Sequence, residues 1–155
     1  MKLRLVFAAA LAGAVAWSSV ALADEVKVAS IEAFLVYGQS GRLSPDIAGG
    51  NAPIDFHNTV IGAGGAEEPA DDVLIVVHFT RSVTGGETPE ISLRAVAHDS
   101  GNPIQERKNL ALAFIDGSTA AKAMLLGDVG CTNVDVTVSV GKAQTGVNLP
   151  FTCGE

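Results

Sequence analysis

Hydrophobic and polar residues alternate along much of this chain, and the alternation is strictest in residues 134–140. Valines occupy every second position there and polar residues the positions between: Val134, Val136, Val138 and Val140 against Asp135, Thr137 and Ser139. A period of two in β-branched residues is typical of a strand with one buried face. The next residues, from Gly141 to Gly146, have the composition of a turn. The pattern predicts a hairpin whose second strand leads toward the end of the sequence.

Two cysteines flank this predicted hairpin. Cys131 and Cys153 are equally far from Lys142, so a hairpin that turns near Lys142 brings both sulfur atoms to its open end. A bridge between neighbouring strands requires Cα atoms roughly 4.4–6.8 Å apart. We therefore predict a cross-strand disulfide that fixes the register of the hairpin. Two free thiols are the alternative.

Six further segments have the pattern of strands, namely residues 26–38, 54–61, 73–80, 90–98, 104–115 and 118–126. The segment 73–80 is almost entirely apolar, which predicts a central strand with both faces covered. The segment 118–126 also fits a two-turn helix, since Ser118 precedes it and Gly127 follows it. A strand is favoured because the segment is short and lies among other strands.

Seven or eight short strands separated by turns predict an all-β fold, an antiparallel sandwich of immunoglobulin-like or fibronectin-like architecture. A closed barrel is the alternative, which the long loop at residues 38–53 makes less natural. The expected sandwich departs from true immunoglobulin domains in two ways. The only tryptophan, Trp17, lies outside the predicted domain, and the predicted disulfide joins neighbouring strands of one hairpin.

The first 23 residues have the pattern of a cleaved secretory signal peptide. A basic start at residues 1–4 precedes an apolar run at residues 5–15, and Ala21 and Ala23 form a small-residue cleavage site before Asp24. A membrane-anchoring helix is the alternative, but the apolar run is short for a bilayer. We therefore expect a single domain at residues 24–155, exported to the periplasm or secreted, where disulfides form.

The charge of the chain narrows the range of partners. The formal net charge is −7, and loss of Lys2 and Arg4 with the signal peptide makes it −9. An acidic surface argues against nucleic acid and anionic membranes as partners. After residue 23 the sequence has no apolar run of the roughly 20 residues that a membrane span needs. A protein or small ligand remains as the expected partner.

Two segments carry a resemblance to a known group. Residues 58–74 and 151–155 resemble a group of small secreted bacterial proteins of uncharacterised function. The resemblance implies an immunoglobulin-like β-sandwich and brings no catalytic residues with it.

Three histidines, His57, His78 and His98, are candidates for a copper or zinc site in an exported protein. They are far apart in the sequence, so they could share a metal only if their strands are neighbours in matched register. Separate imidazoles without a special role are the alternative interpretation.

A stretch of six residues on a glycine-rich segment carries four carboxylates: Glu67, Glu68, Asp71 and Asp72. Oxygen-rich loops suit calcium, although the spacing of an EF-hand loop is absent. A solvated acidic loop is the alternative interpretation.

No catalytic constellation can be assembled from the sequence. It has no Gly-x-Ser-x-Gly motif and no phosphate-binding loop, and the cysteines are expected to be paired. The leading interpretation is thus an exported β-sandwich that serves as an interaction or structural module and is not an enzyme. A periplasmic metal-binding protein and an enzyme of unrecognised type are the alternatives.

Overall fold

The computed structural model describes seven ranges of the chain: residues 26–49, 68–70, 72–82, 88–115, 117–127, 129 and 132–151. Several predictions fall on other residues and lie outside these ranges. They are the signal peptide, the strand at 54–61, both cysteines of the disulfide, and three candidate metal ligands, His57, Glu67 and Asp71.

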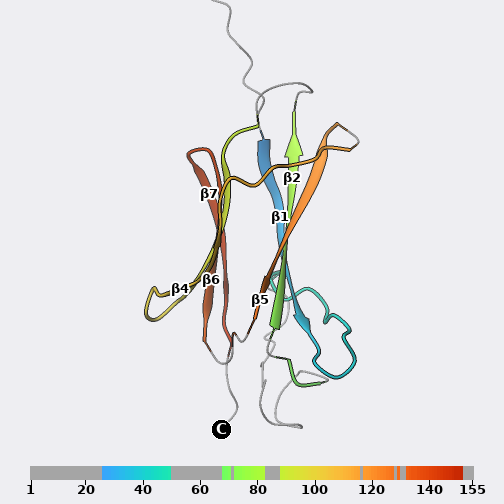
Figure 1. Cartoon of the computed structure of the whole chain (residues 1–155), viewed down its shortest axis with the longest axis vertical. Coiled ribbons are helices and arrows are strands. Elements are labelled where there is room, and N and C mark those ends of the chain that lie inside the picture. The colour runs from blue at the N-terminus through green and yellow to red at the C-terminus, as the bar shows by residue number, and fades with distance from the viewer. Residues whose placement is uncertain are drawn as a thin grey trace, which may run out of the picture.

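Within the described ranges, seven strands form two antiparallel sheets that face each other (Figure 1). The strands are β1 (Val26–Val36), β2 (Asp72–Arg81), β3 (Ile91–Ala97), β4 (Pro103–Arg107), β5 (Thr119–Leu126), β6 (Val134–Val140) and β7 (Ala143–Leu149). One sheet has the order β1-β2-β5 and the other the order β4-β3-β6-β7. The described ranges contain no helix, and none therefore that could cross a membrane. The prediction of an all-β antiparallel sandwich is confirmed.

The core lies between the sheets and is built from the alternating residues that the sequence indicated. The four valines of β6 are buried, and β2 contributes Val73, Ile75, Val77 and Phe79. The two sets come from different sheets, so each sheet covers the hydrophobic face of the other. This is the usual way in which two half-apolar sheets exclude water.

The central strand β2 lies between β1 and β5, but only one of its faces is fully covered. Leu74, Val76 and His78 point away from the core and are half-buried. The expectation that both faces of 73–80 are buried is therefore wrong for the outer face. A sandwich has only two layers, so a strand can be central within its sheet and still have one face toward solvent.

The predictions for residues 118–126 and 104–115 have different outcomes. Residues 119–126 form β5, which pairs with β2 along its whole length, so the strand prediction is confirmed and the helix is excluded.

The predicted strand at 104–115 is wrong in its second half, because pairing stops at Arg107. The chain must then cross from the sheet of β4 to the sheet of β5. During the crossing, Leu110, Leu112 and Phe114 pack against the core without a partner strand.

The hairpin of β6 and β7 is confirmed, but its turn is shorter than predicted. Val140 pairs with Ala143, so only Gly141 and Lys142 form the turn, and β7 begins four residues earlier than expected. Gly141 has a positive φ of 56°, which glycine adopts without strain. Gly146 lies within β7, where a Cβ atom would stand 2.8 Å from the carbonyl oxygen of Val136.

The register of this hairpin alters the geometry expected for the disulfide. The paired residues are centred between Gly141 and Lys142, whereas cysteines directly opposite each other require a centre on Lys142. The last pair of the ladder is Val134 with Leu149. The two-residue turn therefore sets a register for the described pairs that differs from the one the symmetry about Lys142 assumes. Both cysteines lie outside the described residues, and the bridge between Cys131 and Cys153 remains a prediction.

Candidate functional site

The outer face of the three-stranded sheet carries an unusual number of apolar side chains. Phe34 of β1, Leu74 of β2 and Leu125 of β5 are neighbours in one cross-strand row. Val36 follows Phe34 on the same face, and an isolated bridge pairs it with Leu43. Residues paired across antiparallel strands point to the same side of a sheet. These five residues, which we call the apolar patch, therefore extend across the whole width of the sheet.

The ends of the apolar patch are open to solvent. The exposed fraction is 48 % for Leu43 and 50 % for Leu125, and Phe34, Val36 and Leu74 between them are half-buried. Among the residues that the structure describes, only one other large hydrophobic side chain is classed as exposed, Ile115 in the crossing segment. Single exposed leucines are ordinary, but two at opposite ends of a continuous apolar row form a surface that a partner can cover.

Charged pairs border the apolar patch. Glu32 of β1 and His78 of β2 are diagonal neighbours, with 3.4 Å between a carboxylate oxygen and Nε2. Near Leu43, the Arg42 guanidinium lies 3.0 Å from a carboxylate oxygen of Glu68. An apolar centre with a polar border is the usual composition of a protein interface.

Glu68, a member of the predicted acidic loop, already has partners in the protein. Its carboxylate accepts hydrogen bonds from Arg42 and from the backbone N–H of Ser40. The bond from Arg42, followed by the bond with Ser40, lowers the pKa of Glu68 below its ordinary value. Asp72 is the first residue of β2 and pairs with Val36. Within the ranges described here, no three metal-ligating side chains come together, and the calcium site stays a prediction.

The two described histidines are not brought together. His78 lies on the outer face of the three-stranded sheet, while His98 follows β3 and contacts Asp135 on the outer face of the four-stranded sheet. The core separates these two faces. A metal site shared by His78 and His98 therefore gains no support from their positions.

His98 belongs to a polar cluster that the sequence analysis missed. Its Nδ1 lies 2.7 Å from one carboxylate oxygen of Asp135, and the Asn148 amide donates a 2.7 Å hydrogen bond to the other. A hydrogen bond from the His98 backbone N–H to the Asn133 carbonyl holds the turn after β3 against the start of β6. The cluster ties β3, β6 and β7 together on their solvent side.

This cluster predicts a particular pH dependence of stability. The hydrogen bond with Asp135 raises the pKa of His98 above its ordinary value of 6.5. The bond from Asn148, followed by the one with His98, lowers the pKa of Asp135 below 3.8. The stability from His98 is complete below pH 6.5 and is lost as the pH rises through its raised pKa. The stability from Asp135 is complete above pH 3.8 and is lost as the pH falls through its lowered pKa.

We expect His98→Ala to destabilise the protein most between these two limits, and less as the pH rises above neutrality. Urea unfolding of both proteins at several pH values measures this difference. In an Asp135→Asn background the same substitution should have a much smaller pH-dependent effect, because the carboxylate that contributes most to the raised pKa of His98 is absent and only the charge of Asp99 remains. A difference that stays constant from pH 5 to pH 9 would contradict the assignment.

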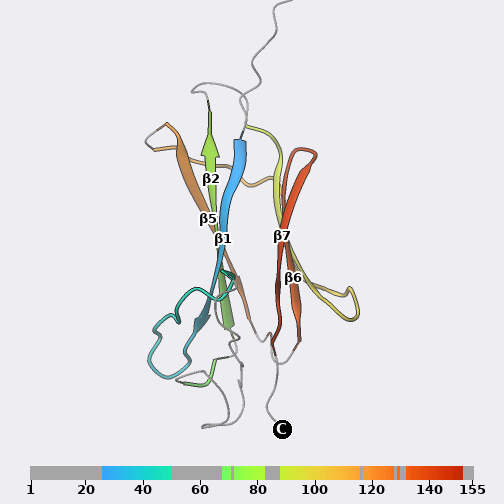
Figure 2. The ribbon, with the colours of Figure 1, turned by 180° about the vertical axis from the view of Figure 1, so that it is seen from behind.

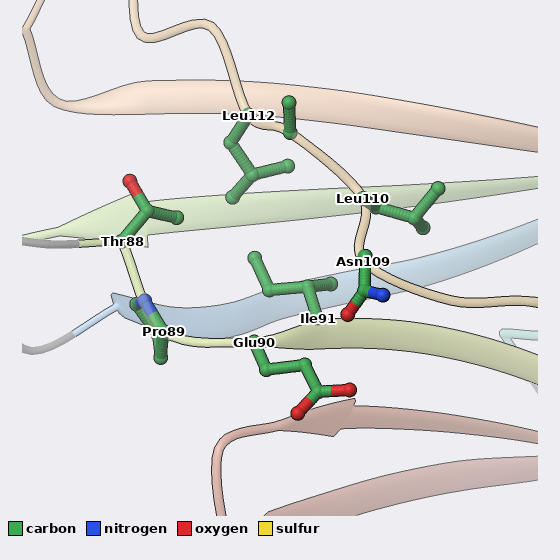
Figure 3. A pocket seen from close by; sticks show the side chains of 8 residues that line it. Thr88, Pro89, Glu90, Ile91, Asn109, Leu110 and Leu112 are labelled. Carbon is green, nitrogen blue, oxygen red and sulfur yellow. The ribbon is translucent and has the colours of Figure 1, made fainter.

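A groove of about 290 Å³ lies between the start of β3 and the crossing segment (Figure 3). The Leu110 N–H donates a hydrogen bond to the Ile91 carbonyl, and Leu112 and Ile91 point toward each other across the groove. Among the described residues that line it, Glu90 is the only charged one. The volume is at the lower limit for ligand pockets, and one carboxylate gives no acid–base pair.

Comparison with models of protein families found no match for this chain, and a search of curated proteins found none that is similar. The resemblance of residues 58–74 and 151–155 to small secreted bacterial proteins therefore remains a prediction.

Proposed function

We propose that this protein is an exported β-sandwich module that binds a partner protein through the apolar patch. The observation that carries the proposal is the pair of half-exposed leucines, Leu43 and Leu125, at the two ends of a continuous apolar row. Contiguous exposed apolar surface of this kind marks interaction sites on soluble proteins. The signal-peptide pattern of residues 1–23 supports action outside the cytoplasm.

The energetics of the patch support the same function. Full burial of a leucine side chain stabilises a complex by roughly 1.5–3 kcal/mol. Covering the exposed halves of Leu43 and Leu125 would then contribute about 2 kcal/mol, before their three neighbours are counted. The charged border, with Arg42 and Glu68 at one end, would orient a partner of complementary charge.

The strand order supports the finer classification as a fibronectin-like module. The first, second and fifth strands form one sheet, and the fourth, third, sixth and seventh form the other. Domains of this architecture occur widely as binding and spacing modules, although fold alone does not define a function. The proposal therefore depends on the patch and not on the fold.

Site-specific photocrosslinking in the exporting cell tests this function. A photoreactive residue at position 43 or 125 should give one discrete adduct, with the same partner at both positions. The matched control is Arg94, an exposed position on the four-stranded sheet. It should give no such adduct. Excess parent protein should compete for the partner, and the variant Leu43→Ser/Leu125→Ser should not.

The double variant Leu43→Ser/Leu125→Ser should fold normally, because serine at exposed sites changes the free energy of unfolding by only about 0.5 kcal/mol per position. Its urea unfolding curve verifies this. Absence of an adduct at both patch positions, or the same adduct at Arg94, would refute a partner site at the apolar patch.

A further inference from the structure

Among the strands that the structure describes, the two sheets have four edge strands, and these lie in two pairs. Strands β1 and β7 run along one side of the sandwich (Figure 2). Strands β4 and β5 are the other two edges, and Arg107 of β4 donates a hydrogen bond to the Ala123 carbonyl of β5. The free side of an edge strand presents unpaired N–H and C=O groups, to which another strand can add.

The edge of β1 is covered by its own loop. The Ser44 backbone N–H donates a 3.0 Å hydrogen bond to the Leu35 carbonyl, and the Ser44 hydroxyl oxygen accepts a 2.9 Å bond from the Leu35 N–H. Asp46 accepts a 3.0 Å hydrogen bond from the Ala33 N–H. Toward the start of the strand, an irregularity between Val28 and Ser30 interrupts the register. Both devices prevent another strand from pairing there.

The edges of β4 and β5 are protected as well. β4 has five residues, begins with Pro103, and carries Glu106 and Arg107. β5 carries Lys122, and its Ala123 carbonyl is occupied by Arg107. A short length, proline and charge are the usual means by which proteins keep edge strands from associating.

The edge strand β7 has none of these devices. Its seven residues pair with β6 without a bulge, and they include no proline and no charged side chain. In the part of the chain that the structure describes, no backbone hydrogen bond reaches its outer side. Because Val140 and Ala143 close a two-residue turn, the N–H groups of Gln144, Gly146 and Asn148 point to that open side.

We propose that β7 pairs with β7 of a second copy of this chain. Antiparallel pairing about a twofold axis would join two four-stranded sheets into one sheet of eight strands. Closed twofold dimers are the commonest protein assemblies, and they place each strand against its own copy in opposite direction. This inference uses a different surface from the apolar patch and does not depend on the function proposed for it.

The side chains of β7 suit its own copy as a partner. Alternate residues Thr145 and Val147 face the core side, and a pairing centred on Gly146 sets Thr145 of one copy beside Val147 of the other. No like charges oppose each other in this arrangement, and Gly146 leaves room at the axis. Val147 is only half-buried although it packs against the core, so a second β7 would cover it.

Sedimentation of the exported protein at micromolar to millimolar concentration tests the proposal. The average mass should rise from that of one chain to that of two. Association should strengthen with added salt, because each exported copy, without Lys2 and Arg4, carries a net charge of −9. Hydrogen exchange at the Gly146 and Asn148 amides should slow as concentration increases.

Two variants at one position separate backbone pairing from other contacts. Gln144→Pro removes an N–H that points outward and no ladder bond to β6, so it should remain a monomer. Gln144→Thr keeps that N–H and should dimerise as the parent does. A parent chain that is monomeric at all concentrations, or a Gln144→Pro variant that dimerises fully, would overturn the proposal. If Leu43→Ser/Leu125→Ser abolishes the dimer instead, the apolar patch is the contact between copies.

Discussion

Replacing Phe79 by alanine is expected to lower the free energy of unfolding by about 3–5 kcal/mol. Phe79 has an exposed fraction of 1 % and lies on the inner face of β2, among Ile75 and Val77. Truncation removes most of a buried ring and leaves a cavity that the surrounding strands can only partly close. Urea unfolding followed by circular dichroism measures the loss.

A second phenylalanine on the same sheet provides the matched control. Phe34 of β1 points to the outer face and is half-buried, as part of the apolar patch. Since its ring already contacts solvent, Phe34→Ala should cost only about 1 kcal/mol. Equal losses for the two substitutions would show that the three-stranded sheet is covered on both faces, which would also remove the basis for the proposed partner site.

The core was predictable from the sequence because it depends on local periodicity. The alternation of Val134 to Val140 defines which face of β6 is buried, whatever strand pairs with it. The pattern of β5 was less decisive, because residues 118–126 also fitted a helix; the extended form is the one in which Met124 and Leu126 point inward together.

The crossing segment could not be predicted in the same way. Leu110, Leu112 and Phe114 alternate as a strand would, and all three do pack against the core. What ends the strand is topology, since the connection has to leave the sheet of β4 and cross to the sheet of β5. Periodicity reports burial, whereas pairing depends on the arrangement of distant segments.

The candidate sites depend on register, which the sequence does not show. The apolar patch exists because Phe34, Leu74 and Leu125 stand in one row, and a shift of one residue in any strand would disperse it. The nearly continuous apolar run of β2 was the available signal, but it indicated complete burial. The contact of His98 with Asp135 likewise depends on how β3 pairs with β6.

The disulfide predicted at the end of the chain should contribute strongly to stability. Replacing Cys131 and Cys153 by serine is expected to lower the free energy of unfolding by roughly 2–5 kcal/mol. Both cysteines lie outside the described residues, but the core holds the chain shortly before each of them. Val129 and Phe151, each two residues before a cysteine, are buried. The last pair of the β6–β7 ladder is Val134 with Leu149. A disulfide between Cys131 and Cys153 would therefore link the two strands beyond their last paired residues.

The mass of the exported protein should increase by two daltons on reduction, because each sulfur gains one hydrogen atom when the bond opens. The reduced parent should then unfold at the same urea concentration as the double-serine variant, since both lack the cross-link. Both should keep the sandwich at low temperature, because Phe79, Leu93 and the other buried side chains of the described strands form an extensive core between the sheets. Two titratable thiols in the native protein, or a double variant as stable as the parent, would contradict the pairing.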